Sequence, residues 1–176
     1  MCYDRRKSQA KKMHTIREDG IAMRIGDHEF TYIQSLRPRL DKDGKMITFM
    51  PQSRYANKKG SRLHKHGDGE FCKFELEKAE RVSGVYAWVV RGENDPIYIG
   101  ETSDFKKRFS TGYGNISPRN CFEGGQITNC KMNKVVLDHY NKGKIIDIYF
   151  LQTDDHKKIE LELLKSINTL YNSKNN

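Results

Sequence analysis

The sequence predicts an α/β fold: a small sandwich whose central three-stranded sheet, mixed or antiparallel, is flanked by helices, with a β-rich extension before it. Two observations lead to this fold class. From Ser83 onward, short β-like runs alternate with amphipathic helical runs in the order ββα, αβα, which is typical of α/β layers. Before Ser83 the chain carries short β-like runs without a helical period. The 176 residues are enough for about one domain with an extension.

The first part of the chain divides into a tail and the extension. Residues 1–20 are polar and aperiodic, and they predict a flexible basic N-terminal tail. Residues 21–82 predict the β-rich extension, because alternating or β-branched runs lie at 28–34, 45–50 and 70–76. The stretch between the last two runs is rich in Gly, Asn and Lys, and it predicts a long loop.

Residues 83–176 predict the second domain, which holds the sandwich. Gly92 and Asn94 supply turn chemistry between its first two strands. Ser103 is the expected cap of the first helix, and Gly143 is expected to end the second. The expected strands cover 84–90, 96–100 and 144–152, and the expected helices cover 103–110, 129–141 and 156–171.

Composition argues against several classes of protein. No apolar run approaches the roughly 20 residues of a membrane span, and the first residues lack the apolar core of a secretory signal. The four cysteines form no C-x-x-C pair, so we interpret them as reduced thiols of a cytoplasmic protein. His64 and His66 have no partner at zinc spacing, and we expect both to be exposed polar residues.

Positive charge is concentrated in the first half of the chain. Residues 1–82 carry 19 Lys and Arg against 12 Asp and Glu, while the remainder carries 13 against 11. Such an asymmetry favours a polyanionic partner, since each phosphate neutralised by a cation releases counterions. The loop around Tyr55 is a candidate backbone-contacting arm, and a merely solvated loop is the alternative. Its cations are Arg54, Lys58, Lys59, Arg62 and Lys65.

A second candidate contact surface is the loop at 115–128 together with the start of the helix behind it. Its polar side chains can bond base edges or phosphates, and ordinary turn and cap chemistry is the alternative. The candidate residues are Arg119, Gln126, Asn129, Lys131 and Asn133.

The strongest signal is a series of four elements in fixed order. The tripeptide GVY at 84–86 and the tripeptide YIG at 98–100 leave eleven residues between their tyrosines. Arg108 follows eight residues after the second motif, and Glu160 precedes Asn172 by twelve residues. Over about residues 83–172 the series resembles the GIY-YIG nuclease family, whose stand-alone and restriction-type members it is most similar to.

Glu160 is unusual on physical grounds as well. At 100° per residue the apolar side chains of the last expected helix fall in one arc, with Glu160 near its middle and Glu162 outside it. A carboxylate on an apolar face is costly unless a cation or hydrogen bonds compensate it. Mg²⁺ is a natural compensation, and an ion pair with Lys157 at the helix edge is the alternative.

The resemblance implies a Mg²⁺-dependent (or Mn²⁺-dependent) DNA endonuclease that hydrolyses phosphodiester bonds, with a homodimer left open. The positive charge of the first half of the chain predicts that residues 21–82 contact DNA. The resemblance also implies that Tyr86 acts as general base or water-positioning group and that Tyr98 orients the water or the phosphate. Arg108 would stabilise the transition-state charge, Glu160 would bind the metal, and Asn172 would complete the catalytic set. The alternative is a catalytically inactive nucleic-acid-binding module of the same fold.

Two departures from the family pattern stand out. Relatives often place a Tyr or His four residues after the arginine, where this chain has Gly112 with Tyr113 next, so the role of Tyr113 stays open. Relatives also often have a small residue where this chain has Thr102. Either Lys106 or Lys107 is then expected to supply the nearby cation.

Overall fold

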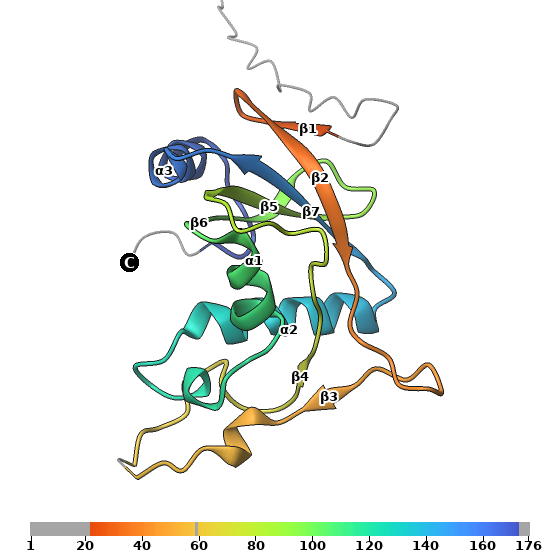
Figure 1. The fold of residues 1–176 in the computed structure, drawn as a ribbon, viewed down its shortest axis with the longest axis vertical. Helices are drawn as coiled ribbons and strands as arrows, with labels where there is room; N and C mark the ends of the chain where they lie inside the picture. The colour runs from red at the N-terminus through yellow and green to blue at the C-terminus, as the bar shows by residue number, and fades with distance from the viewer. Residues whose placement is uncertain (1–21, 59, 173–176) are drawn as a thin grey trace, which may run out of the picture.

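The computed structural model describes residues 22–58 and 60–172, and within them a five-stranded antiparallel sheet with the order β1-β2-β7-β5-β6 forms the centre (Figure 1). The fold is mixed α/β as expected, but the expected three-stranded sheet is wrong, because two strands from the first half of the chain extend it. The expected tail at 1–20 lies outside the described residues. The strands are β1 (Ala22–Ile25), β2 (His28–Leu36), β5 (Gly84–Val90), β6 (Pro96–Thr102) and β7 (Ile146–Gln152).

The two added strands form a hairpin that docks on the sheet through β2. Gly26 has a φ of 59°, which lets the chain reverse between β1 and β2. β1 pairs with β2, and β2 pairs in turn with β7. Met23 and Phe30 face each other across the hairpin, and both are buried. Residues before Ser83 therefore contribute to the same sheet as residues after it.

β5 is a fully buried central strand, and its register places the motif tyrosines together. All seven of its residues are buried, as expected for a central strand covered on both faces. Tyr86 pairs with Gly100, and Trp88 pairs with Tyr98. Alternation along the strands then puts Tyr86, Trp88 and Tyr98 on one face of the sheet.

Helices cover both faces of this sheet (Figure 1). The face that holds Tyr86 packs against α1 (Phe105–Lys107), the π-helix η2 (Arg108–Tyr113) and α2 (Ile127–Asn141), while α3 (His156–Ser166) covers β5 and β6 on the other face. No helix within the described residues is long and apolar enough to cross a membrane.

Several helix ends differ from expectation, among them the start of α2, which lies at Ile127 rather than at 129. The cap of α1 is Asp104 rather than Ser103, because the Asp104 carboxylate accepts the backbone N–H of Lys107 at 2.8 Å. α3 ends at Ser166 rather than at Tyr171, and Ile167 is already extended with a φ of −116°. The chain beyond Ile167 then runs beside β6, where the Tyr171 N–H donates to the Ile97 carbonyl.

A smaller layer packs on α2 away from the main sheet. It contains β3 (Thr48–Phe49), β4 (Phe71–Cys72) and the 3-10 helices η1 (Pro51–Arg54) and η3 (Pro118–Cys121). We call residues 48–72 together with 115–126 the basic lobe. The expected β-runs at 45–50 and 70–76 shrink to the two residues each of β3 and β4.

The basic lobe joins two loops that are far apart in sequence. Tyr55 packs against Phe122 in a tilted arrangement at 4.7 Å between ring centroids, and Leu63 forms a β-bridge to Phe122. His64 bonds the Asn120 carbonyl through Nε2 at 2.6 Å. His64 is therefore buried, and its expected exposure is wrong because the ring satisfies a backbone acceptor inside the lobe. The two candidate contact surfaces of the sequence are one structural unit.

Candidate active site

The π-helix η2 brings Arg108 and Tyr113 together. Its wider turn closes with the hydrogen bond from the Gly114 N–H to the Phe109 carbonyl at 2.9 Å, five residues back. Tyr113, five residues after Arg108, returns to the same side of the helix, and the guanidinium lies 4.4 Å from its ring centroid. The extra residue in the turn explains how a tyrosine at the fifth position reaches the place that a fourth position would occupy in an α-helix.

Three tyrosines meet at the inner end of Arg108. The Tyr86 hydroxyl lies 2.7 Å from the Tyr113 hydroxyl, and the Tyr98 hydroxyl lies 3.4 Å from that same Tyr113 oxygen. Arg108 donates its Nε–H to the Tyr86 hydroxyl at 3.2 Å. Tyr113, whose role the sequence left open, is thus the shared partner of both motif tyrosines.

Burial sets the protonation states of this cluster. Tyr86 is 0% exposed, and desolvation followed by the proximity of Tyr98 raises its pKa above the ordinary range of a phenol, although Arg108 opposes the shift. Desolvation also raises the pKa of Tyr113. Desolvation works in the opposite direction on Arg108, but Tyr86 and Tyr113 outweigh it and raise the Arg108 pKa. At neutral pH Tyr86 and Tyr113 are therefore neutral phenols beside a permanent cation.

Two asparagines of α2 hold this cluster from behind. Asn129 is 2% exposed, and its Oδ1 accepts from Arg108 Nη1 at 3.3 Å, while its Nδ2 donates to Gln126 Oε1 at 2.8 Å. Asn133 is fully buried and bonds the Cys72 N–H, the Cys72 carbonyl and the Tyr113 carbonyl. The structure places both side chains, which were candidates for DNA contact, inside the protein.

Glu160 lies on α3, one turn after the helix begins, and interacts electrostatically with Arg108. It is half-buried, whereas Glu162 is exposed, in line with the expected helix faces. Desolvation and the negative charge of Glu101 raise the pKa of Glu160, while a hydrogen bond from the Glu101 backbone, Arg108 and His156 act in the other direction. The Glu160 carboxylate therefore shares one electrostatic environment with the Arg108 guanidinium.

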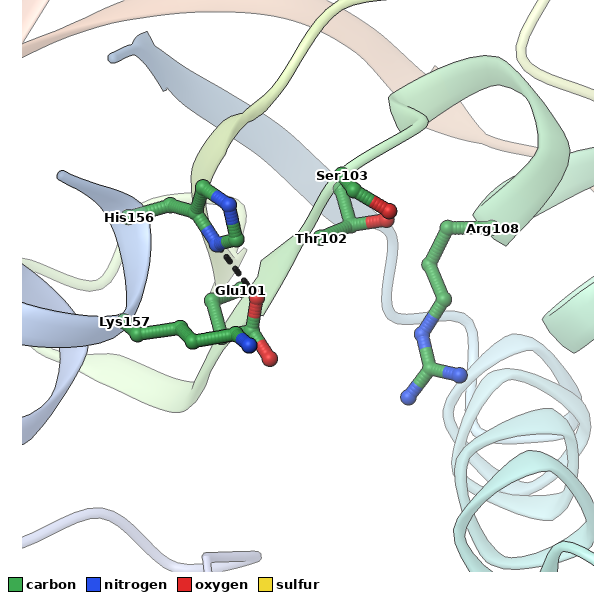
Figure 2. A pocket seen from close by; sticks show the side chains of 6 residues that line it. All are labelled: Glu101, Thr102, Ser103, Arg108, His156 and Lys157. Carbon is green, nitrogen blue, oxygen red and sulfur yellow. Dashed lines mark hydrogen bonds and ion pairs between the residues drawn. The ribbon is translucent and has the colours of Figure 1, made fainter. Parts of the chain in front are cut away.

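A hollow of about 360 Å³ lies between the Arg108 side chain and the first residues of α3 (Figure 2). Arg108 forms one wall, and Glu101, His156 and Lys157 form the other, with Thr102 and Ser103 between them. His156 bonds Glu101 through Nδ1 and Oε2 at 2.5 Å.

A second hollow of about 440 Å³ shares Thr102, Ser103 and Arg108 with the first. It extends past Lys107 to Asn120 and Gln126, at the border of the basic lobe. We call the two hollows together the groove. Arg108 stands at its middle, with α3 at one end and the basic lobe at the other.

Asn172, the last of the motif residues, bonds the β6 backbone rather than lining the groove. Its Nδ2 donates to the Ile99 carbonyl at 2.6 Å, and its Oδ1 accepts the Ile99 N–H at 2.8 Å. The Thr169 hydroxyl donates to the same Oδ1 at 2.6 Å. In this arrangement Asn172 positions β6, the strand that carries Tyr98.

The cations expected to contact DNA differ in their exposure and in whether they bond other parts of the protein. Lys59 lies outside the described residues. The exposed ones are Arg54, Lys58, Arg62, Lys65 and Arg119 on the basic lobe and Lys106 and Lys107 on α1. Two are tied to the protein: Arg119 donates to the Glu123 carbonyl at 2.8 Å, and Lys131 donates to the Tyr171 carbonyl at 2.6 Å. Burial, and then the nearby charge of Lys65, lower the pKa of Lys131.

Sequence reasoning missed Glu101 and His156 as residues of the site. One signal for His156 was available, since it precedes Glu160 by four residues and thus shares its helix face. Glu101, next to the YIG motif, gave no comparable signal, because only the fold brings β6 and the start of α3 together.

Glu160 and the neighbouring Glu101 suit a hard cation that keeps most of its coordinated water. In the part of the chain that the structure describes, no group of three or more His, Cys, Asp or Glu side chains is placed to hold a metal ion. Glu160, half-buried beside a second carboxylate, is nevertheless a negative charge that a cation would offset. Mg²⁺ often takes only one or two carboxylates, with waters and substrate phosphate completing its shell.

Comparison with known proteins adds no assignment. No family model, no curated protein and no solved structure matches this chain significantly. The function of the protein is therefore inferred from its residues and their geometry.

Proposed function

We propose that this protein is a Mg²⁺-dependent or Mn²⁺-dependent DNA endonuclease that hydrolyses phosphodiester bonds in the groove around Arg108. The observation that carries the proposal is that Arg108, at the middle of the groove, interacts with both Tyr86 of β5 and Glu160 of α3: it donates a hydrogen bond to the Tyr86 hydroxyl, and its charge acts against the rise that burial causes in the pKa of Glu160. These residues are the ones that the resemblance to GIY-YIG nucleases selects, and nothing in their sequence separation requires them to meet.

Arg108 supplies the charge that the reaction needs. Hydrolysis adds negative charge to the phosphoryl oxygens in the transition state, and a planar guanidinium with several donors can bind two of them at once. Its position is fixed before substrate arrives, by Tyr86 on one side and Asn129 on the other. Preorganisation of this kind avoids reorganisation during the reaction.

Glu160 is the residue that would hold the metal ion. When bound, Mg²⁺ would neutralise charge on a phosphoryl oxygen and lower the pKa of a coordinated water. Tyr86 and Tyr113 hold Arg108 from the inner side, because the Tyr86 hydroxyl accepts the Nε–H and the guanidinium packs on the Tyr113 ring. Tyr98 completes the hydroxyl cluster through Tyr113.

The basic lobe supplies the grip on DNA. The lobe that carries the exposed cations borders one end of the groove through Asn120 and Gln126, and the Lys107 side chain lines the groove itself. Contacts from such cations go to phosphates and carry no sequence information directly. The lobe therefore serves affinity, and the region around Arg108 serves the reaction.

The second candidate function is an inactive nucleic-acid-binding module, and the complete burial of the Tyr86 hydroxyl favours it. A phenol without access to solvent cannot act on a water molecule in the arrangement described. Under this alternative the groove binds the phosphate backbone without cutting it.

One experiment separates the two functions. Purified protein is incubated with supercoiled plasmid in Mg²⁺, in Mn²⁺ and in EDTA, and DNA binding is measured by fluorescence anisotropy in parallel. A nuclease converts the plasmid to nicked or linear forms only with metal, and Arg108→Ala abolishes the conversion while Lys158→Ala, a substitution of an exposed lysine on α3, does not. Binding without any conversion in either metal would establish the binding module instead.

A further inference from the structure

We propose that His156, held by Glu101, is the general base that activates the attacking water, an inference that rests on the proposed nuclease function. Hydrolysis requires a group that accepts a proton from water. The motif residue best suited to that role, Tyr86, has its hydroxyl buried under Arg108 and Tyr113, so the groove needs another base.

The Glu101–His156 pair has the geometry of an oriented base. An ionised carboxylate only accepts hydrogen bonds, so the 2.5 Å contact places the proton of the neutral imidazole on Nδ1. The lone pair is then on Nε2, the nitrogen that a carboxylate partner leaves free for proton transfer in hydrolase triads. Figure 2 shows this second nitrogen turned away from Glu101, on the edge of the ring nearer Ser103.

The hollow provides the space for the reaction. His156 and Arg108 line opposite sides of the same 360 Å³ volume, so a phosphate bound to the guanidinium faces the imidazole across it (Figure 2). A water between them can be oriented by Nε2 toward phosphorus. Only 13% of the His156 side chain is exposed, which limits alternative ring orientations.

The step balances without a further reactant. A water proton passes to Nε2 as the water oxygen forms a bond to phosphorus, and Glu101 stabilises the resulting imidazolium. The bond from phosphorus to the leaving oxygen breaks, its electron pair stays on that oxygen, and solvent supplies the proton there. His156 returns its proton to solvent before the next cycle.

The test compares two variants of His156 with a control histidine on the β1–β2 hairpin. His156→Ala removes the base, His156→Gln keeps a polar side chain that cannot take up the proton, and His28→Ala changes a histidine outside the groove. Single-turnover cleavage of plasmid at saturating protein, DNA affinity and the circular dichroism spectrum are measured for each variant.

We expect both His156 variants to lose about 10²- to 10⁴-fold in cleavage rate, the range for removing a general base, with DNA affinity within about threefold of the unchanged protein. Added imidazole should restore part of the rate of His156→Ala in proportion to its concentration, because the small base can occupy the space left by the side chain. It should not restore His156→Gln. A structural role for His156 would give no such rescue. Glu101→Gln should lose less, about tenfold, since it impairs only the orientation of the ring.

The outcomes separate the inference from the function on which it rests. If the unchanged protein cleaves DNA and both His156 variants cleave at its rate, or if imidazole rescues neither variant, His156 is not the base and the nuclease proposal stands. If the unchanged protein cleaves nothing with either metal, both proposals fail. A misfolded His156→Ala would show in its spectrum, and the rate of His156→Gln then decides.

Discussion

The region around Arg108 and the basic lobe carry charge in opposite ways. Near Arg108 the polar atoms are enclosed and paired, so that each hydroxyl, amide or guanidinium constrains the next. On the lobe an apolar core fixes the backbone while Arg54, Lys58, Arg62 and Lys65 project into solvent. Catalysis requires that the reacting atoms are held within fractions of an ångström of their positions. Binding of a polyanion requires only a sufficient number of cations. Single substitutions should therefore be severe near Arg108 and mild on the lobe.

The largest effect should come from Glu160, one of the two carboxylates of α3. Glu160→Ala should abolish cleavage, because the site loses its metal-holding carboxylate, while DNA affinity stays within about threefold. The matched control, Glu162→Ala, removes an exposed carboxylate one half-turn away and should cleave normally. Plasmid cleavage and Mn²⁺ binding by isothermal titration calorimetry measure the two effects. Equal behaviour of the two variants would show that α3 does not distinguish its faces in the way we describe.

Changes at Arg108 and at its hydroxyl partner should rank next. Arg108→Lys should reduce the cleavage rate at least 10²-fold, because a point charge cannot reproduce the bonds of a planar fork. Tyr86→Phe removes one hydrogen bond to a charged group, which contributes about 1.5–3 kcal/mol, and should reduce the rate roughly 10- to 100-fold. Single-turnover rates measure both. Normal turnover by Arg108→Lys would argue that the guanidinium is only part of the scaffold.

Neutralising the lobe should produce a smaller and different effect. A variant with Gln at positions 54, 58, 62 and 65 should bind all DNA sequences more weakly, by about tenfold or more at moderate salt. Its slope of log K against log salt should fall by about one unit for each phosphate that the protein no longer neutralises. Its rate at saturating DNA should be unchanged. Anisotropy titrations at several salt concentrations test this, and an unaltered slope would assign the grip to other residues.

The smallest effect concerns stability at alkaline pH. Burial raises the pKa values of Tyr86 and Tyr113, so above about pH 10, the ordinary pKa of tyrosine, the unfolded chain loses protons that the folded chain retains. Their contribution to stability is therefore present below pH 10 and declines as pH rises, by about 1.4 kcal/mol per pH unit for each group.

Urea denaturation between pH 8 and 11 measures this decline. Tyr113→Phe should lose stability less steeply over that interval than the unchanged protein. Tyr140→Phe, at a half-buried position near the end of α2, serves as the control and should follow the unchanged protein. Parallel pH dependence in all three proteins would contradict a buried hydroxyl at Tyr113.

Local patterns predicted the fold well where neighbouring residues decide it. The extent of β5 follows from a continuous apolar run, and the end of α2 follows from Gly143, whose φ is 70°. The docking of β2 on β7 was not predictable in this way, because it pairs residues more than 100 positions apart. The early end of α3 was also missed, since an apolar period continues through the extended segment that packs beside β6.

The sequence predicted which residues belong to the candidate site better than it predicted what each residue does there. Motif spacing selected Arg108, which lines the groove, and Tyr86 and Glu160, which both interact with Arg108. The polar chemistry of Asn129 and Asn133 was recognised, but sequence alone cannot tell whether an amide bonds a base edge or a buried backbone group. The position of Tyr113 beside Arg108 depends on the π-helix η2, and no local pattern in the sequence predicted a π-helix there.

The pairing of Asn172 with Ile99 has a consequence for self-association. β6 is an edge strand of the main sheet. An uncovered edge strand offers unpaired backbone N–H and C=O groups to any other extended chain. The amide of Asn172, together with Tyr171, occupies part of that row much as a further strand would. Tyr171 and Asn172 thus protect the edge of β6 against pairing with a strand of another molecule and against aggregation.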